Sequence, residues 1–146
     1  MSKKVLLGMS GGVDSSVSAI LLKKQGYEVI GVTMQLWENE SDIEKNIVQD
    51  FINDAKKVCE KLGIKHHVVD LRDEFRKSVI DNFICTYNCA KTPNPCVECN
   101  KFMKFGAFYK VAKDFGCDYI ATGHYAKIEY SEKYKQYVLM KAKSEK

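Results

Sequence analysis

Short apolar segments alternate with longer segments of helical periodicity through residues 3–122, and this alternation constrains the fold more than any other feature. Between the short segments, apolar side chains recur every three or four residues, as in amphipathic helices. Strands that alternate with helices are joined by right-handed crossovers, which build an open, mostly parallel sheet with helices on both faces. The sequence therefore predicts an α/β, Rossmann-like fold. Strands are expected at residues 3–8, 27–34, 66–71 and 118–122, and helices at 13–21, 43–62, 75–83 and 102–115.

Two further segments depart from this alternation. Residues 85–100 contain both prolines of the chain, which predicts a loop. Residues 125–130 and 136–141 flank a short polar stretch, and this arrangement predicts a β-hairpin near the C-terminus. In the helix expected at 102–115, the spacing of the phenylalanines predicts that they lie in the core rather than on a base-stacking surface.

The composition is that of a single folded domain. The chain has 146 residues, of which 45% are hydrophobic and 29% charged, and this balance excludes wholesale disorder. No apolar run approaches the ~20 residues that span a bilayer, and the apolar stretch near Met1 is too short for a secretory signal. We therefore expect a cytoplasmic protein without a membrane partner. The net charge of +4 is compatible with a phosphate-rich partner but does not identify one.

A glycine-rich run, Gly8-Met9-Ser10-Gly11-Gly12-Val13-Asp14-Ser15, follows the first expected strand. Its glycines permit close backbone approach, and the free N–H groups at the start of the next helix, with the serine hydroxyls, suit a phosphate. The run is neither a Walker A sequence nor Gly-x-Gly-x-x-Gly, and for three glycines alone an ordinary capped turn is an equal alternative. The full run resembles the pyrophosphate-binding loop of ATP pyrophosphatases. In that setting the Asp14 carboxylate would be a magnesium ligand.

Four of the six cysteines fall within one segment, at positions 85, 89, 96 and 99. Clustered cysteines in a cytosolic protein indicate metal binding or catalysis. Cys99 lies at or just before the start of the helix expected at 102–115, with Lys101 and Lys104 nearby, a setting that favours the thiolate and hence a nucleophile. A zinc or iron–sulfur site built from the four thiols stays open as the alternative, although two well-separated C-x-x-C pairs are absent.

The glycine run, Asn94-Pro95-x-x-x-Cys99-Asn100-Lys101, the aromatic repeat that follows and Ala121-Thr122-Gly123-His124-Tyr125 together resemble tRNA-specific 2-thiouridylases. The resemblance covers their N-terminal ATP pyrophosphatase domain, from Lys4 to the last residue, and implies an adenine nucleotide alpha hydrolase-like fold. It implies a transferase that uses ATP and Mg²⁺ to adenylate the C2 oxygen of the wobble uridine and then replaces that oxygen with sulfur. The sulfur would arrive as a cysteine persulfide, so tRNA and a persulfide-donating relay protein are the implied partners.

The same resemblance implies roles for individual residues. Cys99 would be the catalytic nucleophile, and Asp14 would act in catalysis as the magnesium ligand. Asn94, Pro95 and Cys96 would line the pocket for the flipped base. Apart from the resemblance, the position of His124 at a strand end favours a structural hydrogen-bonding role over catalysis, and Trp37 either packs over the nucleotide or lies in the core. The residues implied in ATP binding are Gly8, Met9, Ser10, Gly11, Gly12, Val13, Asp14, Ser15, Met34 and Gly123.

The chain departs from this family in what it lacks. The second catalytic cysteine of the family lies beyond residue 146, and the tRNA-binding and C-terminal β domains have no counterpart within 1–146. We therefore expect a truncated domain that binds ATP weakly and is incomplete for turnover. Two other functions stay open: another ATP pyrophosphatase that adenylates a small molecule, or a module that binds zinc or an iron–sulfur cluster, the latter at Cys96 and Cys99. The sequence does not decide whether these two cysteines form a disulfide.

Overall fold

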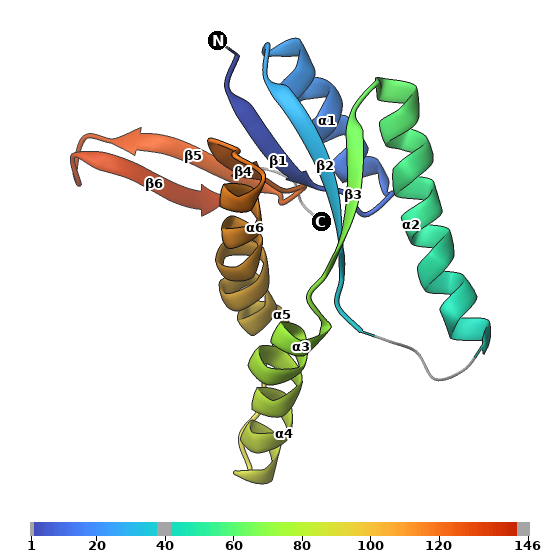
Figure 1. Cartoon of the computed structure of the whole chain (residues 1–146). Coiled ribbons are helices and arrows are strands. Elements are labelled where there is room, and N and C mark those ends of the chain that lie inside the picture. The colour runs from blue at the N-terminus through green and yellow to red at the C-terminus, as the bar shows by residue number, and fades with distance from the viewer. Residues whose placement is uncertain (1, 38–41, 143–146) are drawn as a thin grey trace.

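Four strands form one parallel sheet in the order β3-β2-β1-β4 (Figure 1). The computed structural model describes residues 2–37 and 42–142, and it places side chains at all of these except 42–48. The chain runs outward from β1 to β3 and then adds β4 on the other side of β1, so the strand order reverses between β1 and β4. Open α/β sheets bind ligands at the carboxyl ends of the strands beside such a reversal. The strands are β1 (Lys4–Gly8), β2 (Glu28–Gln35), β3 (Lys65–Asp70) and β4 (Tyr119–Ala121), and all three pairings are parallel, as predicted.

Helices cover both faces of the sheet, which confirms the predicted fold class (Figure 1). Successive strand residues point to opposite faces, so Leu6 and Leu7 of β1 belong to two separate cores. Leu7 packs in a core with Ala19 and Ala55, from α1 (Val13–Lys24) and α2 (Asp42–Leu62). Leu6 packs in the other core with side chains from α3 (Arg72–Phe75), η1 (Arg76–Ile80), η2 (Cys99–Ala107) and α6 (Phe108–Asp114).

Helix α1 turns a face of small residues toward the sheet. Its buried residues are Ser15 and Ala19, whereas Val13 and Leu21 are more than half exposed. The helical spacing of the apolar residues therefore predicted the helix but not the side that packs. Small side chains on the packed face allow the start of α1 to lie close to the end of β1, where the glycine run turns.

The loop expected at 85–100 is largely helical, so that prediction was wrong. Helix α4 (Asp81–Asn88) extends past Cys85, and α5 (Pro95–Glu98) leads directly into η2, which leaves only residues 89–94 outside helices. Pro95 occupies the first helical position, where its missing N–H removes no hydrogen bond. The proline that suggested a loop therefore starts a helix.

The π-helical winding of η2 changes which side chains reach the core. A π-helix joins residue i+5 to residue i, and the fully buried Met103 and Phe108 are five residues apart. Phe102 and Phe105 are 41% and 56% exposed, so the prediction of core phenylalanines was wrong for these two, whereas Phe108 is fully buried and Phe115 packs against the core as predicted. That prediction assumed the α-helical period, which the segment does not follow until α6.

The predicted hairpin is present. Strands β5 (Ala126–Ser131) and β6 (Gln136–Lys141) pair antiparallel, with Ser131 opposite Gln136 beside the turn. They form a separate two-stranded sheet that extends to one side of the parallel sheet (Figure 1). None of the helices that the structure describes combines the length and the apolar character needed to span a bilayer.

Candidate functional site

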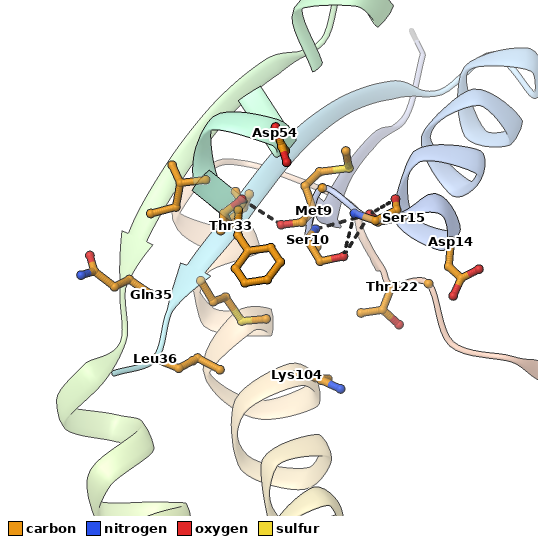
Figure 2. Close-up of a pocket in the computed structure, with 18 of the residues that line it drawn as sticks. Met9, Ser10, Asp14, Ser15, Thr33, Gln35, Leu36, Asp54, Lys104 and Thr122 are labelled. Atoms are coloured by element: carbon orange, nitrogen blue, oxygen red, sulfur yellow. Dashed lines mark hydrogen bonds between the residues drawn. The ribbon is translucent and has the colours of Figure 1, made fainter. Parts of the chain in front are cut away.

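A cavity of about 710 Å³ opens at the carboxyl ends of β1, β2 and β4, where the strand order reverses (Figure 2). Its walls come from the glycine run, the end of β2, the segment after β4 and the helices α2 and η2. Val13, whose side chain is 76% exposed, does not line it. The other nine residues implied in ATP binding do: Gly8, Met9, Ser10, Gly11, Gly12, Asp14, Ser15, Met34 and Gly123. Trp37 also lines the cavity and is half exposed, so it is not a core residue.

The glycine run is held by contacts that require glycine at one position. Gly11 has a φ of +78°, and a Cβ atom there would lie 3.1 Å from the backbone nitrogen of Ala55 in α2. Ser15 is buried, its hydroxyl donates to the Gly12 carbonyl at 3.1 Å, and its Oγ lies 3.3 Å from Ser10 Oγ. No side-chain hydrogen bond caps the start of α1. The loop therefore brings its serine hydroxyls and the first N–H groups of α1 to one end of the cavity, which is the arrangement that binds phosphate.

Asp14 is held by the segment that follows β4. The hydroxyl of Tyr125 donates to Asp14 Oδ1 at 2.7 Å, and this hydrogen bond raises the pKa of Tyr125. A Cβ atom at Gly123 would lie 3.2 Å from the backbone carbon of Asp14, so a larger residue would push these two closely packed segments slightly apart. The described residues contain no group of three or more His, Cys, Asp or Glu side chains that could hold a metal ion. One carboxylate beside a phosphate site nevertheless fits Mg²⁺, which binds through one or two carboxylates and substrate phosphates.

His124 joins the segment after β4 to η2. Its Nδ1 lies 2.6 Å from Thr122 Oγ1, and its Nε2 lies 3.2 Å from Asn100 Oδ1 and 3.4 Å from Lys104 Nζ. Burial, and then the nearby Lys104 ammonium, lower the pKa of His124. An imidazole held on both nitrogens agrees with the structural role expected for this residue. Sequence reasoning missed Lys104 and Thr122 as cavity residues, because only the packing of η2 against the end of β4 brings them there.

Cys99 does not line the cavity. It is the first residue of η2, as expected, but α5 runs directly into η2, so Cys99 does not lie at the free N–H groups of a helix start. The helix begins at Pro95, with Asn94 Oδ1 accepting a hydrogen bond from the Val97 N–H at 3.2 Å, and Cys99 lies one turn further along. Cys99 is half-buried against the core, and burial raises the pKa of its thiol, although the Lys104 ammonium opposes this shift. The expectation that its setting favours the thiolate was therefore wrong, because desolvation outweighs the nearby charge.

The other residues of this segment lie on the surface. Asn94, Pro95 and Cys96 are exposed and do not line the cavity. All six cysteines are free, so the structure contains no Cys96–Cys99 disulfide. Because no three metal-binding side chains come together in the described part of the chain, the cysteines at 85, 89, 96 and 99 do not form the four-thiol site that was considered.

The parallel sheet, its strand reversal and the glycine-loop cavity define an adenine nucleotide alpha hydrolase-like α/β domain. The chain belongs to the family described as the tRNA methyl transferase HUP domain, which matches residues 3–146. Curated relatives confirm the resemblance to tRNA-specific 2-thiouridylases. The enzyme named tRNA-specific 2-thiouridylase MnmA from Clostridioides difficile (strain 630) is 52% identical over 149 residues, covering 100% of this chain and 41% of that protein. Its namesake from Clostridium beijerinckii is 53% identical over 133 residues, covering 88% of this chain and 37% of that protein.

Solved structures show the same fold. The U34-tRNA thiolase NcsA from Methanococcus maripaludis, solved with its [4Fe-4S] cluster, aligns with a TM-score of 0.60 at 28% identity. That alignment covers 84% of this chain and 39% of NcsA. A predicted subunit of tRNA methyltransferase from Methanocaldococcus jannaschii aligns with a TM-score of 0.52 at 25% identity, covering 84% of this chain and 53% of that one. The chain spans about two fifths of the length of the curated relatives named above.

Proposed function

We propose that this chain is the N-terminal ATP pyrophosphatase domain of a tRNA-uridine 2-sulfurtransferase. The observation that carries the proposal is the cavity at the strand reversal, which gathers nine of the ten residues implied in ATP binding. The relatives named as tRNA-specific 2-thiouridylases support tRNA as the substrate. The rival function, a pyrophosphatase that adenylates a small molecule, needs no thiol, whereas this chain carries Cys99 on the helix that lines the cavity.

The proposed chemistry has two steps. In the first, the C2 oxygen of the wobble uridine attacks the α-phosphorus of ATP, so that an O–P bond forms and pyrophosphate leaves. In the second, the outer sulfur of a persulfide on Cys99 attacks C2, and AMP leaves with the former C2 oxygen. A second cysteine thiol then attacks Cys99 Sγ, which releases the sulfur on the base and leaves a disulfide. The N–H groups of the glycine loop would stabilise the charge on the departing phosphates.

The residues divide between these two steps. Met34 and Gly123 would contact the nucleoside, the glycine run would bind the phosphates, and Asp14 would hold Mg²⁺. Asn94, Pro95 and Cys96 would receive the flipped base beside Cys99. The ATP cavity and the segment around Cys99 are directly connected, because Asn100 follows Cys99 and its side chain contacts His124 at the cavity wall.

The proposal also includes partners and a place in the cell. A persulfide-donating relay protein would load Cys99, and the activity would be cytoplasmic, together with tRNA. We place the second cysteine and most of the tRNA-binding surface in the part of the relatives that this chain does not span. The chain by itself is therefore expected to bind Mg-ATP without completing thiolation.

An iron–sulfur cluster at Cys96 and Cys99 is the alternative for the sulfur step. It is favoured by the similarity to NcsA, a tRNA thiolase whose structure was solved with a [4Fe-4S] cluster. Such clusters are held by four cysteine thiolates, and the described residues bring no third ligand to these two. An iron assay and the visible spectrum of anaerobically purified protein separate the alternatives. A brown protein that loses its colour on Cys96→Ser would favour a cluster mechanism over the persulfide mechanism. A colourless, iron-free protein would favour the persulfide mechanism.

Calorimetric titration of the chain with Mg-ATP tests the proposed function. We expect binding that Asp14→Asn weakens, because the carboxylate is lost, and that Cys99→Ala leaves unchanged, because Cys99 does not line the cavity. Pyrophosphate release that depends on tRNA, measured on the protein joined to the remaining part of its relatives, extends the test to the first step. Absence of ATP binding by the chain would overturn the proposal.

A further inference from the structure

Lys104 is the one lysine or arginine that lines the cavity within the described residues. It is half-buried, and it makes no ion pair with any carboxylate that the structure describes. The charged side chains that share the cavity with it are Asp14 and Asp54, both acidic. Asp14 accepts the hydroxyl of Tyr125, and Asp54 pairs with Lys57 at 3.2 Å, so both acids already have partners. The ammonium of Lys104 is therefore a cation without an anion, at the wall of a cavity that suits phosphates.

The position of Lys104 follows from the π-helical winding of η2. Because the backbone bonds of a π-helix join residue i+5 to residue i, residues five apart lie one turn apart on nearly the same side. Asn100 and Phe105 show this directly, since both contact His124, the first at 3.2 Å and the second with ring centroids 5.7 Å apart. Cys99 and Lys104 are the preceding pair in the same register. An α-helix would instead place Met103 one turn after Cys99.

The surroundings of Lys104 hold it toward the cavity. Its Nζ lies 3.4 Å from His124 Nε2, and His124 is fixed from its other nitrogen by Thr122. In Figure 2 Lys104 lies below Ser10, across the cavity from the glycine loop. Burial raises the pKa of the Cys99 thiol and the charge of Lys104 opposes this rise, which places the same ammonium within electrostatic reach of the thiol.

We propose that Lys104 binds the phosphates of the nucleotide from the side opposite the glycine loop and thereby links nucleotide binding to the helix that carries Cys99. The inference rests on the proposed function, because it requires ATP in this cavity. The glycine loop supplies N–H groups, and Lys104 supplies the side-chain cation that they lack. Binding would also hold η2, the helix that carries Cys99, more firmly against the cavity when the phosphates are in place.

Nucleotide titrations of the chain and three variants test the contact. A hydrogen bond to a charged group is lost in Lys104→Met, so Mg-ATP affinity should fall about tenfold or more. The affinity for adenosine, measured by competition, should not change, because adenosine has no phosphate. Lys104→Arg should recover most of the ATP affinity. Lys101→Met is the matched control on the same helix, since Lys101 does not line the cavity and its Nζ instead lies over the Phe102 ring.

Hydrogen exchange measures whether nucleotide binding is coupled to η2, the helix that carries Cys99. Mg-ATP should slow amide exchange across Cys99–Ala107 in the wild-type chain and in Lys101→Met, but not in Lys104→Met. Equal ATP affinity and equal protection in Lys104→Met would overturn this inference and leave the proposed function standing. Equal losses for ATP and adenosine would also overturn it, because the substitution would then disturb the site rather than a phosphate contact. A wild-type chain that binds no ATP would overturn the proposed function, and this inference with it.

Discussion

Replacing Gly31 by alanine should destabilise the fold at the point where β2 supports the cavity. Gly31 lies opposite Leu7 in the sheet, and a Cβ atom there would lie 2.8 Å from Cys59 Sγ and 3.0 Å from Met9 Cγ. Both neighbours are buried, and Cys59 is fully so, which leaves its sulfur no room to rotate away. Overpacking of this kind costs about 1–3 kcal/mol of unfolding free energy. For a domain of this size that loss lowers Tm by about 3–10 °C.

Urea unfolding followed by circular dichroism measures the effect, and two further variants test its cause. Removing the sulfur in Cys59→Ala makes room for the new methyl group. Gly31→Ala should therefore cost less in that background, with a coupling energy of about 0.5–2 kcal/mol. Gly8→Ala is the matched control in the neighbouring strand, because its Cβ atom would meet no other atom closer than 3.8 Å. A Gly31→Ala chain as stable as Gly8→Ala, or an equal penalty with and without Cys59, would refute the reasoning.

Two predictions follow from the pKa shifts. Burial raises the pKa of Cys99, so its alkylation at pH 7.5, followed by mass spectrometry, should be slower than that of a cysteine peptide. Lys104→Met should slow the alkylation further, because it removes the cation that opposes this shift. Alkylation of Cys99 as fast as that of the peptide would contradict this prediction. Burial lowers the pKa of His66 and His124, so the unfolded chain binds more protons as pH falls through about 6.5, and Tm should fall there. His66→Asn/His124→Asn should flatten this dependence, and an unchanged slope would contradict the assignment.

The fold was predictable wherever local pattern and burial agree. Strands β1 and β2 are apolar runs that fill the interior between two helical layers, and all four strands of the parallel sheet, including the more exposed outer strands β3 and β4, lie close to their expected places. The hairpin was equally clear, because its two strands flank a polar turn. The spacing of apolar residues was a poor guide at α1, where Val13 and Leu21 are exposed. Such spacing predicts a helix without identifying the face that packs against the sheet. The same spacing misplaced Phe102 and Phe105 in the core, because no local sequence pattern predicts the π-helical period of η2.

The candidate site also has one part that the sequence predicts and one part that only the fold assembles. The glycine run is continuous in sequence, and its conformation depends on nearby glycines and serines, so the chemistry proposed for it is visible in the residue order. The opposite wall is assembled from residues that lie far from the loop along the chain. Lys104, Thr122 and His124 meet there only because η2 packs beside the end of β4. Sequence reasoning placed Lys104 near Cys99 but had no means of placing it in the cavity.

The amino-acid order alone determined the alternation of strands and helices, the glycine loop and the family resemblance, since each depends on residues that are neighbours along the chain. Only the tertiary structure decided how strongly each group is desolvated and which charges lie near it. Cys99 illustrates the difference. Its neighbours in sequence favour a thiolate, yet packing against the core raises the pKa of the thiol. Burial is set by the whole fold, and in a partly buried site desolvation outweighs a single nearby charge.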